Sequence, residues 1–287
     1  MTDTIVFNEV NKKLGDFQLQ NINFKVKKGH ITGFIGPNGA GKTTVIKLIM
    51  NLMKPDYGDI KVFDKEIDAD PKSIKQRIGF VYADNNYYDH LNPNEIKSVV
   101  APFYDRWDDD IFLHYIKKFK LPLKKKTKKF STGMRMKLSL AIALSHDADL
   151  ILLDEPTSGL DPIFRANFLE YLKGIIQDEE KTVFFSSHII SDLEQIADYV
   201  ICIDNGQIIF NNRKDYLLDS YYFLTGPNSA LNTLNKENLI GMRQSAFNFK
   251  ALTNNQAEIN EATRHKVSVR QATLEEIIIY TIGDDLL

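Results

Sequence analysis

The chain has 287 residues, of which 43% are hydrophobic and 26% charged, so it can form one large domain with an appendage around a substantial core. Its formal net charge of −2 excludes a strong overall attraction to nucleic acid or anionic lipid. A single cysteine, Cys202, excludes an internal disulfide, and its apolar neighbours (YVICID) predict a buried rather than a reactive thiol.

The beginning of the chain, MTDTIVFNEV, lacks the basic start and the apolar stretch of a signal peptide. No apolar run reaches the roughly 18 residues that a membrane-spanning helix needs. These features predict a cytoplasmic protein, which can still dock on a partner in the membrane.

Residues 1–35 alternate apolar and polar positions and then become solidly apolar at ITGFIG, which predicts edge strands leading to a central buried strand. A helix is predicted over 42–53. After KPDYGDIKVFD and RIGFVY, the segment 84–145 is predicted to be mostly helical. From DLILLDEP onward, strands alternate with helices at 162–176 and 191–197. This alternation predicts an α/β fold with a mostly parallel core sheet, into which the helical block is inserted.

The composition changes after Asn211, which predicts a main domain over 1–211 and an accessory segment over 212–287. In the accessory segment, YYFLTG, SAFNFKALTN and HKVSVRQ predict short strands, and LEEIIIYTI predicts a closing helix. The whole is a small α/β extension without a recognisable chemical motif.

The stretch GPNGAGKTT satisfies the phosphate-loop pattern G-x-x-x-x-G-K-[ST] and lies between a buried strand and a helix. Its glycines allow backbone amides to curl around an anion. Lys42 can reach the β- and γ-phosphates of a nucleotide, and the Thr43 hydroxyl can ligate Mg²⁺. The alternative is a glycine-rich turn that caps a helix. The candidate nucleotide-binding residues of the loop are Asn38, Gly39, Ala40, Gly41, Lys42, Thr43 and Thr44.

Three further polar residues follow buried strands. In LILLDEP, Asp154 is predicted to hold Mg²⁺, and Glu155 to polarise the attacking water as a general base. Both fall at the carboxyl end of a strand, where open α/β sheets bind ligands; the alternative is a pair of solvated loop acids. His188 ends TVFFSSH, where it is predicted to hydrogen-bond the γ-phosphate, with a structural histidine as the alternative.

The stretch KKFSTGMRMKLSLAIALS places Ser131 and Gly133 at the start of an apolar helix. Ser131 is a typical N-cap residue, so one interpretation is an ordinary helix start. The other is that the free amides of this helix end, with Gly133 allowing close approach, point at a phosphate.

With the phosphate loop, FSTGM, LILLDEP, SGLD and the late histidine in this order, residues 8–211 resemble the nucleotide-binding subunit of an ABC transporter. FSTGM corresponds to the LSGGQ signature of that family. It keeps Ser131 and Gly133 but has Phe130, Thr132 and Met134 at the other positions. The segment from FYDRWDDDIF to SGLDP is similar to the ABC-2 subgroup that serves bacterial peptide, toxin and antibiotic exporters, phenol-soluble-modulin exporters among them.

The resemblance implies a P-loop NTPase of ABC type with an N-terminal antiparallel β subdomain. It implies an ATPase that uses ATP and Mg²⁺ and powers a separate transmembrane permease of ABC-2 type, which attaches it to the inner face of the membrane. In the family, two subunits, identical or different, close head to tail over two ATP molecules. Ser131 and Gly133 of one subunit then act on the ATP held by the other, and SGLD meets the other subunit. The aromatic pair Tyr87–Tyr88 is interpreted either as part of a groove for a permease helix or as ordinary packing.

Two positions depart from the family pattern. Ala83 replaces a glutamine that normally contacts Mg²⁺, so Asp84 is the candidate substitute as a metal ligand. Leu14 stands where an aromatic residue normally stacks on adenine. Phe17, three residues later, is the candidate replacement, with a core role as the alternative.

Two other functions are alternatives to the exporter ATPase. A soluble ABC ATPase acting on ribosomes or DNA carries tandem domains or long coiled coils, which this sequence lacks, and no nucleic-acid partner is predicted. A nucleotide-dependent regulatory module would have a decayed site. The departures at Ala83 and Leu14 favour this alternative, and the presence of Lys42, Asp154, Glu155 and His188 argues against it.

Overall fold

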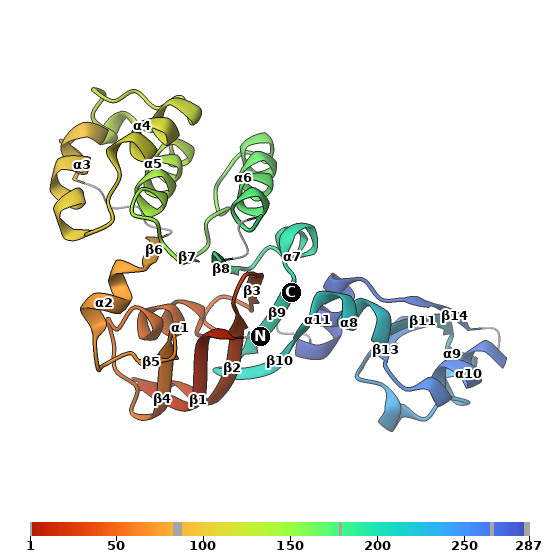
Figure 1. Cartoon of the computed structure of the whole chain (residues 1–287). Helices are drawn as coiled ribbons and strands as arrows, with labels where there is room; N and C mark the ends of the chain where they lie inside the picture. The colour runs from red at the N-terminus through yellow and green to blue at the C-terminus, as the bar shows by residue number, and fades with distance from the viewer. Residues whose placement is uncertain (1, 83–87, 178–179, 265–266, 284–287) are drawn as a thin grey trace.

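The computed structural model describes residues 2–82, 88–177, 180–264 and 267–283. They form three sheets and the helices that cover them (Figure 1). The predicted α/β class is confirmed, with a mostly parallel core sheet and an antiparallel β subdomain.

The first sheet is antiparallel and has the strand order β2-β1-β4-β5. Its strands are β1 (Asp3–Leu14), β2 (Phe17–Lys27), β4 (Tyr57–Val62) and β5 (Lys65–Glu66).

The second sheet has the order β10-β9-β3-β8-β7-β6, and all its strand pairs are parallel except β10 with β9. Its strands are β3 (Ile31–Ile35), β6 (Ile78–Val81), β7 (Leu150–Leu153), β8 (Thr182–Ser187), β9 (Tyr199–Asp204) and β10 (Gln207–Arg213). Every residue of β3, β7 and β8 is buried, which explains their continuous apolar runs: both faces of a parallel sheet are covered.

The helices of the main body are α1 (Lys42–Ile49), α2 (Pro71–Gln76), α3 (Pro93–Val100), α4 (Asp109–Lys118), α5 (Thr132–Leu144), α6 (Pro162–Ile175) and α7 (Ile190–Ile196), with short 3₁₀ turns at Ala101–Phe103 and Thr127–Lys129. Helices α3, α4 and α5 lie together at one end of the molecule (Figure 1). They have a small core of their own, a buried cluster that includes the fully buried Phe112 with Ile96, Ile116 and Leu138. A capping box between Asn92 and Glu95 fixes where α3 begins.

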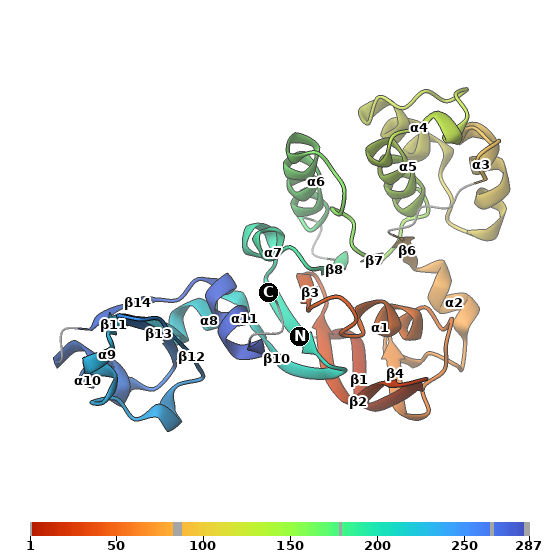
Figure 2. The same cartoon turned by 180° about the vertical axis from the view of Figure 1, so that it is seen from behind.

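The third sheet lies beyond α8 (Lys214–Ser220) and extends to one side of the main body, as both views show (Figures 1 and 2). It is antiparallel with the order β12-β13-β11-β14, formed by β11 (Tyr222–Pro227), β12 (Gly241–Gln244), β13 (Asn248–Thr253) and β14 (Ser268–Gln271). The remaining elements are α9 (Asn228–Leu231), the 3₁₀ turn Lys236–Asn238, α10 (Gln256–Arg264) and α11 (Leu274–Ile282).

The core of the second sheet continues into the C-terminal segment. Phe185 of β8 and Leu193 of α7 belong to the same buried cluster as Leu217 of α8 and Ile277 of α11. The boundary expected after Asn211 lies inside β10, which pairs with β9 through Arg213. Helix α11 therefore packs against the main body rather than against the third sheet alone.

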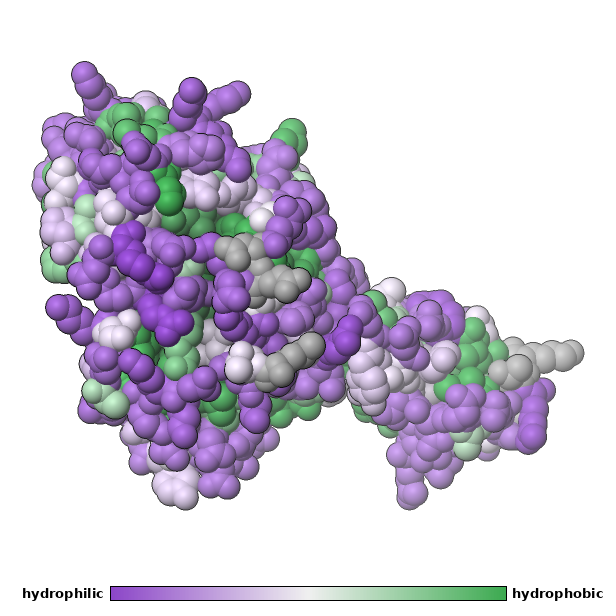
Figure 3. All heavy atoms as spheres, viewed as in Figure 1, coloured by the Kyte–Doolittle hydropathy of each residue, from purple (hydrophilic) through white to green (hydrophobic). Residues whose placement is uncertain are grey.

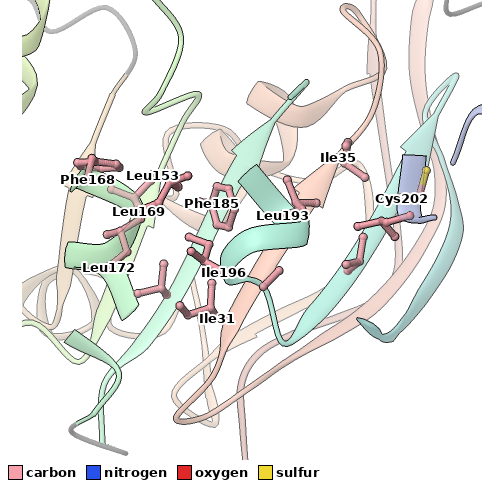
Figure 4. Packing of buried hydrophobic residues seen from close by; sticks show 14 of the residues in the cluster. Ile31, Ile35, Leu153, Phe168, Leu169, Leu172, Phe185, Leu193, Ile196 and Cys202 are labelled. Atoms are coloured by element: carbon pink, nitrogen blue, oxygen red, sulfur yellow. The ribbon is translucent and has the colours of Figure 1, made fainter. Parts of the chain in front are cut away.

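Helices α6 and α7 cover one face of the core sheet. Leu169 and Leu172 of α6 and Ile196 of α7 point toward the sheet, with Phe185 between them (Figure 4). Burying each such side chain contributes about 1.5–3 kcal/mol. Cys202 lies in the same cluster with none of its surface exposed, and burial raises the pKa of its thiol to about 12, so the predicted buried thiol is found.

The surface is mostly hydrophilic, with smaller hydrophobic patches on the face that Figure 3 shows. Within the described residues, no helix has both the length and the apolar composition that crossing a bilayer requires.

A buried histidine, His146, lies in the turn between α5 and β7. Its ring stacks on Tyr104 with centroids 3.8 Å apart, and its Nδ1 atom has no hydrogen-bond partner among the described residues. Burial lowers the pKa of His146 to about 4, with a smaller contribution in the same direction from the nearby charge of Arg106. The unfolded chain, with a histidine pKa near 6.5, therefore binds more protons than the folded chain between these values.

The contribution of His146 to the free energy of unfolding is therefore expected to be present above about pH 6.5 and to be lost as the pH drops toward 4. From pH 7 to pH 5, His146 alone should cost about 2 kcal/mol of unfolding free energy. His146→Phe keeps a ring beside Tyr104 and should remove that contribution, which urea unfolding at the two pH values measures. His114→Gln, at an exposed position of α4, is the control. An unchanged pH dependence in His146→Phe would show that His146 is not responsible.

Candidate functional site

The residues after β3, β7 and β8 meet at one cleft of 580 Å³. Because these strands are parallel neighbours, their carboxyl ends lie at the same edge of the sheet. The cleft is lined by Phe17, Asn38, Gly39, Gly41, Lys42, Thr43, Thr44, Glu155, Ser158 and His188. Most of the residues predicted for nucleotide binding are thus brought together.

The phosphate loop connects β3 to α1 and brings the N-terminus of α1 into the cleft. Gly41, which precedes the helix, has a φ of 112°, and a Cβ there would lie 2.8 Å from Cζ of Phe17. Only glycine fits this combination of backbone and contact. Because the first amides of a helix have no partner within it, they are available to an anion such as phosphate.

Lys42 is buried at the base of the loop. Its Nζ donates hydrogen bonds to the carbonyl oxygens of Gly36, at 2.7 Å, and Pro37, at 3.0 Å. It also pairs with Glu155, with 3.3 Å between Nζ and Oε1. The loop therefore holds one ammonium group in place, where it can bind phosphate oxygens.

Asp154 and Thr43 supply oxygen atoms of the kind that Mg²⁺ prefers. The Thr43 hydroxyl donates to Asp154 Oδ2 at 3.3 Å, and the Ser186 hydroxyl donates to Asp154 Oδ1 at 2.7 Å. Burial raises the pKa of Asp154, while the hydrogen bonds from Ser186 and Thr43 act in the opposite direction. A divalent cation would favour the ionised carboxylate, so the hydroxyl and carboxylate present fit a magnesium ion.

Glu155 and His188 are in direct contact. Glu155 Oε2 lies 2.6 Å from His188 Nδ1 and also accepts a hydrogen bond from the backbone amide of His188 at 3.3 Å. The backbone of Glu155 is left-handed, with φ of 48°, and its amide donates to the Ser186 hydroxyl at 3.0 Å. A carboxylate held between the ammonium group of Lys42 and the ring of His188 is placed to accept a proton from a water in the cleft.

The signature residues Ser131 and Gly133 do not line this cleft. The Ser131 hydroxyl accepts a hydrogen bond from the Met134 amide at 3.3 Å and so caps α5. This is the contact that an ordinary helix start predicts. A Cβ on Gly133 would lie 3.2 Å from Cδ1 of Phe164 in α6, so the glycine also leaves room for that ring. The cleft of this chain is therefore formed without Ser131 and Gly133.

The other candidate residues are Phe17, Asp84 and the pair Tyr87–Tyr88. Phe17 lines the cleft beside Gly41 and also packs against the core, so both roles predicted for it agree with its position. Asp84, the candidate metal ligand, and Tyr87 lie outside the described residues. The neighbouring Tyr88 is 70% exposed, which excludes core packing for its own side chain.

Two residues of the site were not predicted from the sequence: Ser186, which is buried behind the cleft, and Ser158, which lines it. Ser186 holds both Asp154 and the Glu155 amide, and its signal was a polar residue inside the apolar strand TVFFSS. Ser158 lines the cleft, although the sequence placed it only in a loop that meets the other subunit.

Comparisons with known proteins agree with this geometry. A family model described as "ABC transporter" matches residues 19–158. The bacitracin transport ATP-binding protein BcrA of Bacillus licheniformis is 34% identical over 76% of this chain and 72% of its own length. The ABC transporter ATP-binding protein NatA of Bacillus subtilis is 33% identical over 70% of this chain and 84% of its own length.

The chain belongs to the ABC transporter family, as an ATP-binding subunit.

Solved structures of ABC cassettes share its fold. A structure titled as the ATP-binding subunit of an ABC transporter covers 75% of this chain and 92% of its own, with a TM-score of 0.67 and 23% identity. The cassette MJ0796, in a dimeric post-hydrolysis state with ADP and phosphate, covers 73% of this chain and 98% of its own, with a TM-score of 0.65 and 24% identity.

Family membership establishes the class of reaction. ABC ATP-binding subunits bind ATP, and their hydrolysis of ATP is coupled to transport. They dimerise and work with membrane permeases. The chain is therefore an ATPase subunit of an ABC transporter, as its motif order predicts.

Proposed function

We propose that this chain is the ATP-hydrolysing subunit of an ABC-2 type exporter whose cargo is a peptide, toxin or drug. It works from the cytoplasmic face of the membrane, where it attaches through a separate permease. Support for the cargo class comes from two relatives named as bacitracin transport ATP-binding proteins, from Bacillus licheniformis and Enterococcus faecalis.

The observation that carries the hydrolysis mechanism is the contact of Glu155 with both Lys42 and His188 in one cleft. Lys42 and the loop amides bind the β- and γ-phosphates of ATP. Glu155 takes a proton from the attacking water, and His188 orients Glu155 and donates a hydrogen bond toward the γ-phosphate. Phe17, at the mouth of the loop, stacks on the adenine.

Thr43 and Asp154 would hold the magnesium ion that accompanies ATP. Its chemistry there would be to neutralise part of the negative charge of the phosphates. The buried hydroxyl of Ser186 keeps Asp154 oriented toward Thr43.

Two subunits complete each other's sites in this proposal. Ser131 and the amides at the start of α5 bind the γ-phosphate of an ATP held by the other subunit, because that helix end lies outside the cleft of its own chain.

Capture of the tagged protein from detergent-treated membranes, in the presence of Mg-ATP, tests the exporter assignment. A membrane protein with several spanning helices is expected to co-purify in stoichiometric amounts. The Lys42→Ala variant should co-purify with the same permease, because the substituted residue lies inside the cleft. Recovery of ribosomal proteins or DNA in place of a membrane protein would contradict the assignment and favour a soluble ABC ATPase.

A further inference from the structure

A buried carboxylate, Asp192, lies behind the cleft in the first turn of α7. Its side chain is 1% exposed. The Thr157 hydroxyl donates a hydrogen bond to Asp192 Oδ2 at 2.5 Å, and Arg165 Nε donates to Asp192 Oδ1 at 2.6 Å. Arg165 also donates to the Ser191 hydroxyl at 2.9 Å. None of these four residues lines the cleft.

These contacts connect the two segments that carry Glu155 and His188. Thr157 follows Glu155 by two residues and is itself 1% exposed, while Asp192 follows His188 by four residues. Arg165 anchors the same carboxylate to α6, at the far end of the loop that begins with Glu155. The carboxylate thus holds together both sides of the 2.6 Å contact between Glu155 and His188.

The backbone of Glu155 needs such a constraint. Its left-handed φ of 48° is an uncommon conformation for a residue with a side chain, and it persists only where neighbouring contacts hold it. On one side, the Ser186 hydroxyl accepts the Glu155 amide hydrogen bond. On the other side, the bond from Thr157 to Asp192 fixes the chain two residues later.

The chemistry of the cluster favours a tight constraint. A buried carboxylate is costly unless it is paired and hydrogen-bonded, and Asp192 receives one hydrogen bond on each oxygen, one of them from a guanidinium. Movement of Thr157 away from Asp192 would leave a buried acceptor without its partner. The loop is therefore held by an interaction that is unfavourable to break.

We propose that Asp192 is a positioning residue for ATP hydrolysis. It acts through Thr157 and Arg165 to keep the side chains of Glu155 and His188 in hydrogen-bonding contact. This inference rests on the proposed role of Glu155 as the general base. Asp192 does not contact the cleft, so it sets the rate of the chemical step and leaves nucleotide affinity to the phosphate loop.

The matched pair Thr157→Val and Thr157→Ser tests the proposal in the full chain. Valine has nearly the shape of threonine without the hydroxyl, and serine keeps the hydroxyl without the methyl group. In Thr157→Val, ATP turnover should fall by about 10- to 100-fold, because small displacements of a catalytic group have effects of that size. The affinity for a fluorescent ATP analogue should stay within about twofold of wild type, since the phosphate loop is untouched. Thr157→Ser should retain most of the turnover.

Glu155→Gln, measured under the same conditions, separates the positioning role of Asp192 from the general-base role of Glu155. Wild-type turnover in Thr157→Val with an inactive Glu155→Gln would overturn the role of Asp192 and leave the proposed function intact. Wild-type turnover in Glu155→Gln would overturn the general base itself. If Thr157→Val lost affinity and turnover together with its thermal stability, the cluster would be only structural, which also overturns the proposal.

Arg165→Lys decides the matter if Thr157→Val does not fold. It keeps the positive charge but lacks the planar group that bonds both Asp192 and Ser191. Turnover should fall by about tenfold with nucleotide affinity unchanged. Wild-type turnover in a folded Arg165→Lys would contradict the proposal.

Discussion

Glu155→Gln is expected to bind ATP as well as the wild-type chain while its hydrolysis rate falls by about 10²- to 10⁴-fold, the usual range for loss of a general base. Glutamine keeps the size and the hydrogen-bonding capacity of the side chain but accepts no proton. The phosphate loop and the Thr43–Asp154 pair are unchanged, so the contacts proposed for ATP and Mg²⁺ remain.

The effect on binding follows from the charges in the cleft. The carboxylate of Glu155 pairs with Lys42 at 3.3 Å, and a phosphate group would compete for the same ammonium. Neutralising Glu155 frees Lys42 for the phosphate and removes a negative charge near it. ATP affinity should therefore be equal to or higher than that of the wild type, and ATP-bound dimers should accumulate in light scattering with Mg-ATP.

Steady-state phosphate release and equilibrium binding of an ATP analogue measure the two parts separately. Glu194→Gln, at an exposed position of α7, removes a carboxylate outside the cleft and should leave both unchanged. A Glu155→Gln variant that hydrolyses ATP at the wild-type rate would show that another group takes the proton.

Much of the fold could be predicted because the strands of its core sheet are buried on both faces. Continuous apolar runs such as LILL and TVFF have no other stable place in a chain of this size, and the helices between them require parallel pairing. The strands of the C-terminal segment were also predicted, except β12, whose sequence GMRQ has no apolar alternation. The sequence could not show that Ile277 of α11 joins the core of the main body, because an apolar helix does not specify its partner.

The candidate site was predicted where chemistry and strand ends coincide. Lys42, Glu155 and His188 converge because parallel strands deliver their carboxyl ends to one edge. The supporting groups Ser186 and Asp192 were missed, since a serine in a strand and an aspartate in a helix have many ordinary roles. Their function depends on which buried partner each contacts, and that is decided by tertiary packing.

The separation of Ser131 from the cleft of its own chain leads to the second large effect. Lys42→Ala removes the ammonium that binds phosphate, and Ser131→Asp keeps the cap of α5 while adding a negative charge that repels phosphate. Each variant alone should be nearly inactive. In a dimer of one Lys42→Ala chain and one Ser131→Asp chain, one site combines an intact phosphate loop with an intact signature, so activity should return.

The reference for that dimer is a second one, in which a wild-type chain pairs with a chain carrying both substitutions. It contains the same mutations in the same number, but each of its two sites has one defective half. Two different affinity tags, used in sequence, isolate each dimer free of its parents, and native mass spectrometry verifies the composition.

The rate of ATP hydrolysis by these two dimers tests most directly whether two subunits share each catalytic site. The structure leads us to expect about half of the wild-type dimer's rate from the dimer with separated defects, since one of its two sites is whole, and almost none from the dimer with both defects in one chain. Equal rates from the two dimers would contradict action of Ser131 on the other subunit's ATP and would leave Ser131 as a helix cap only.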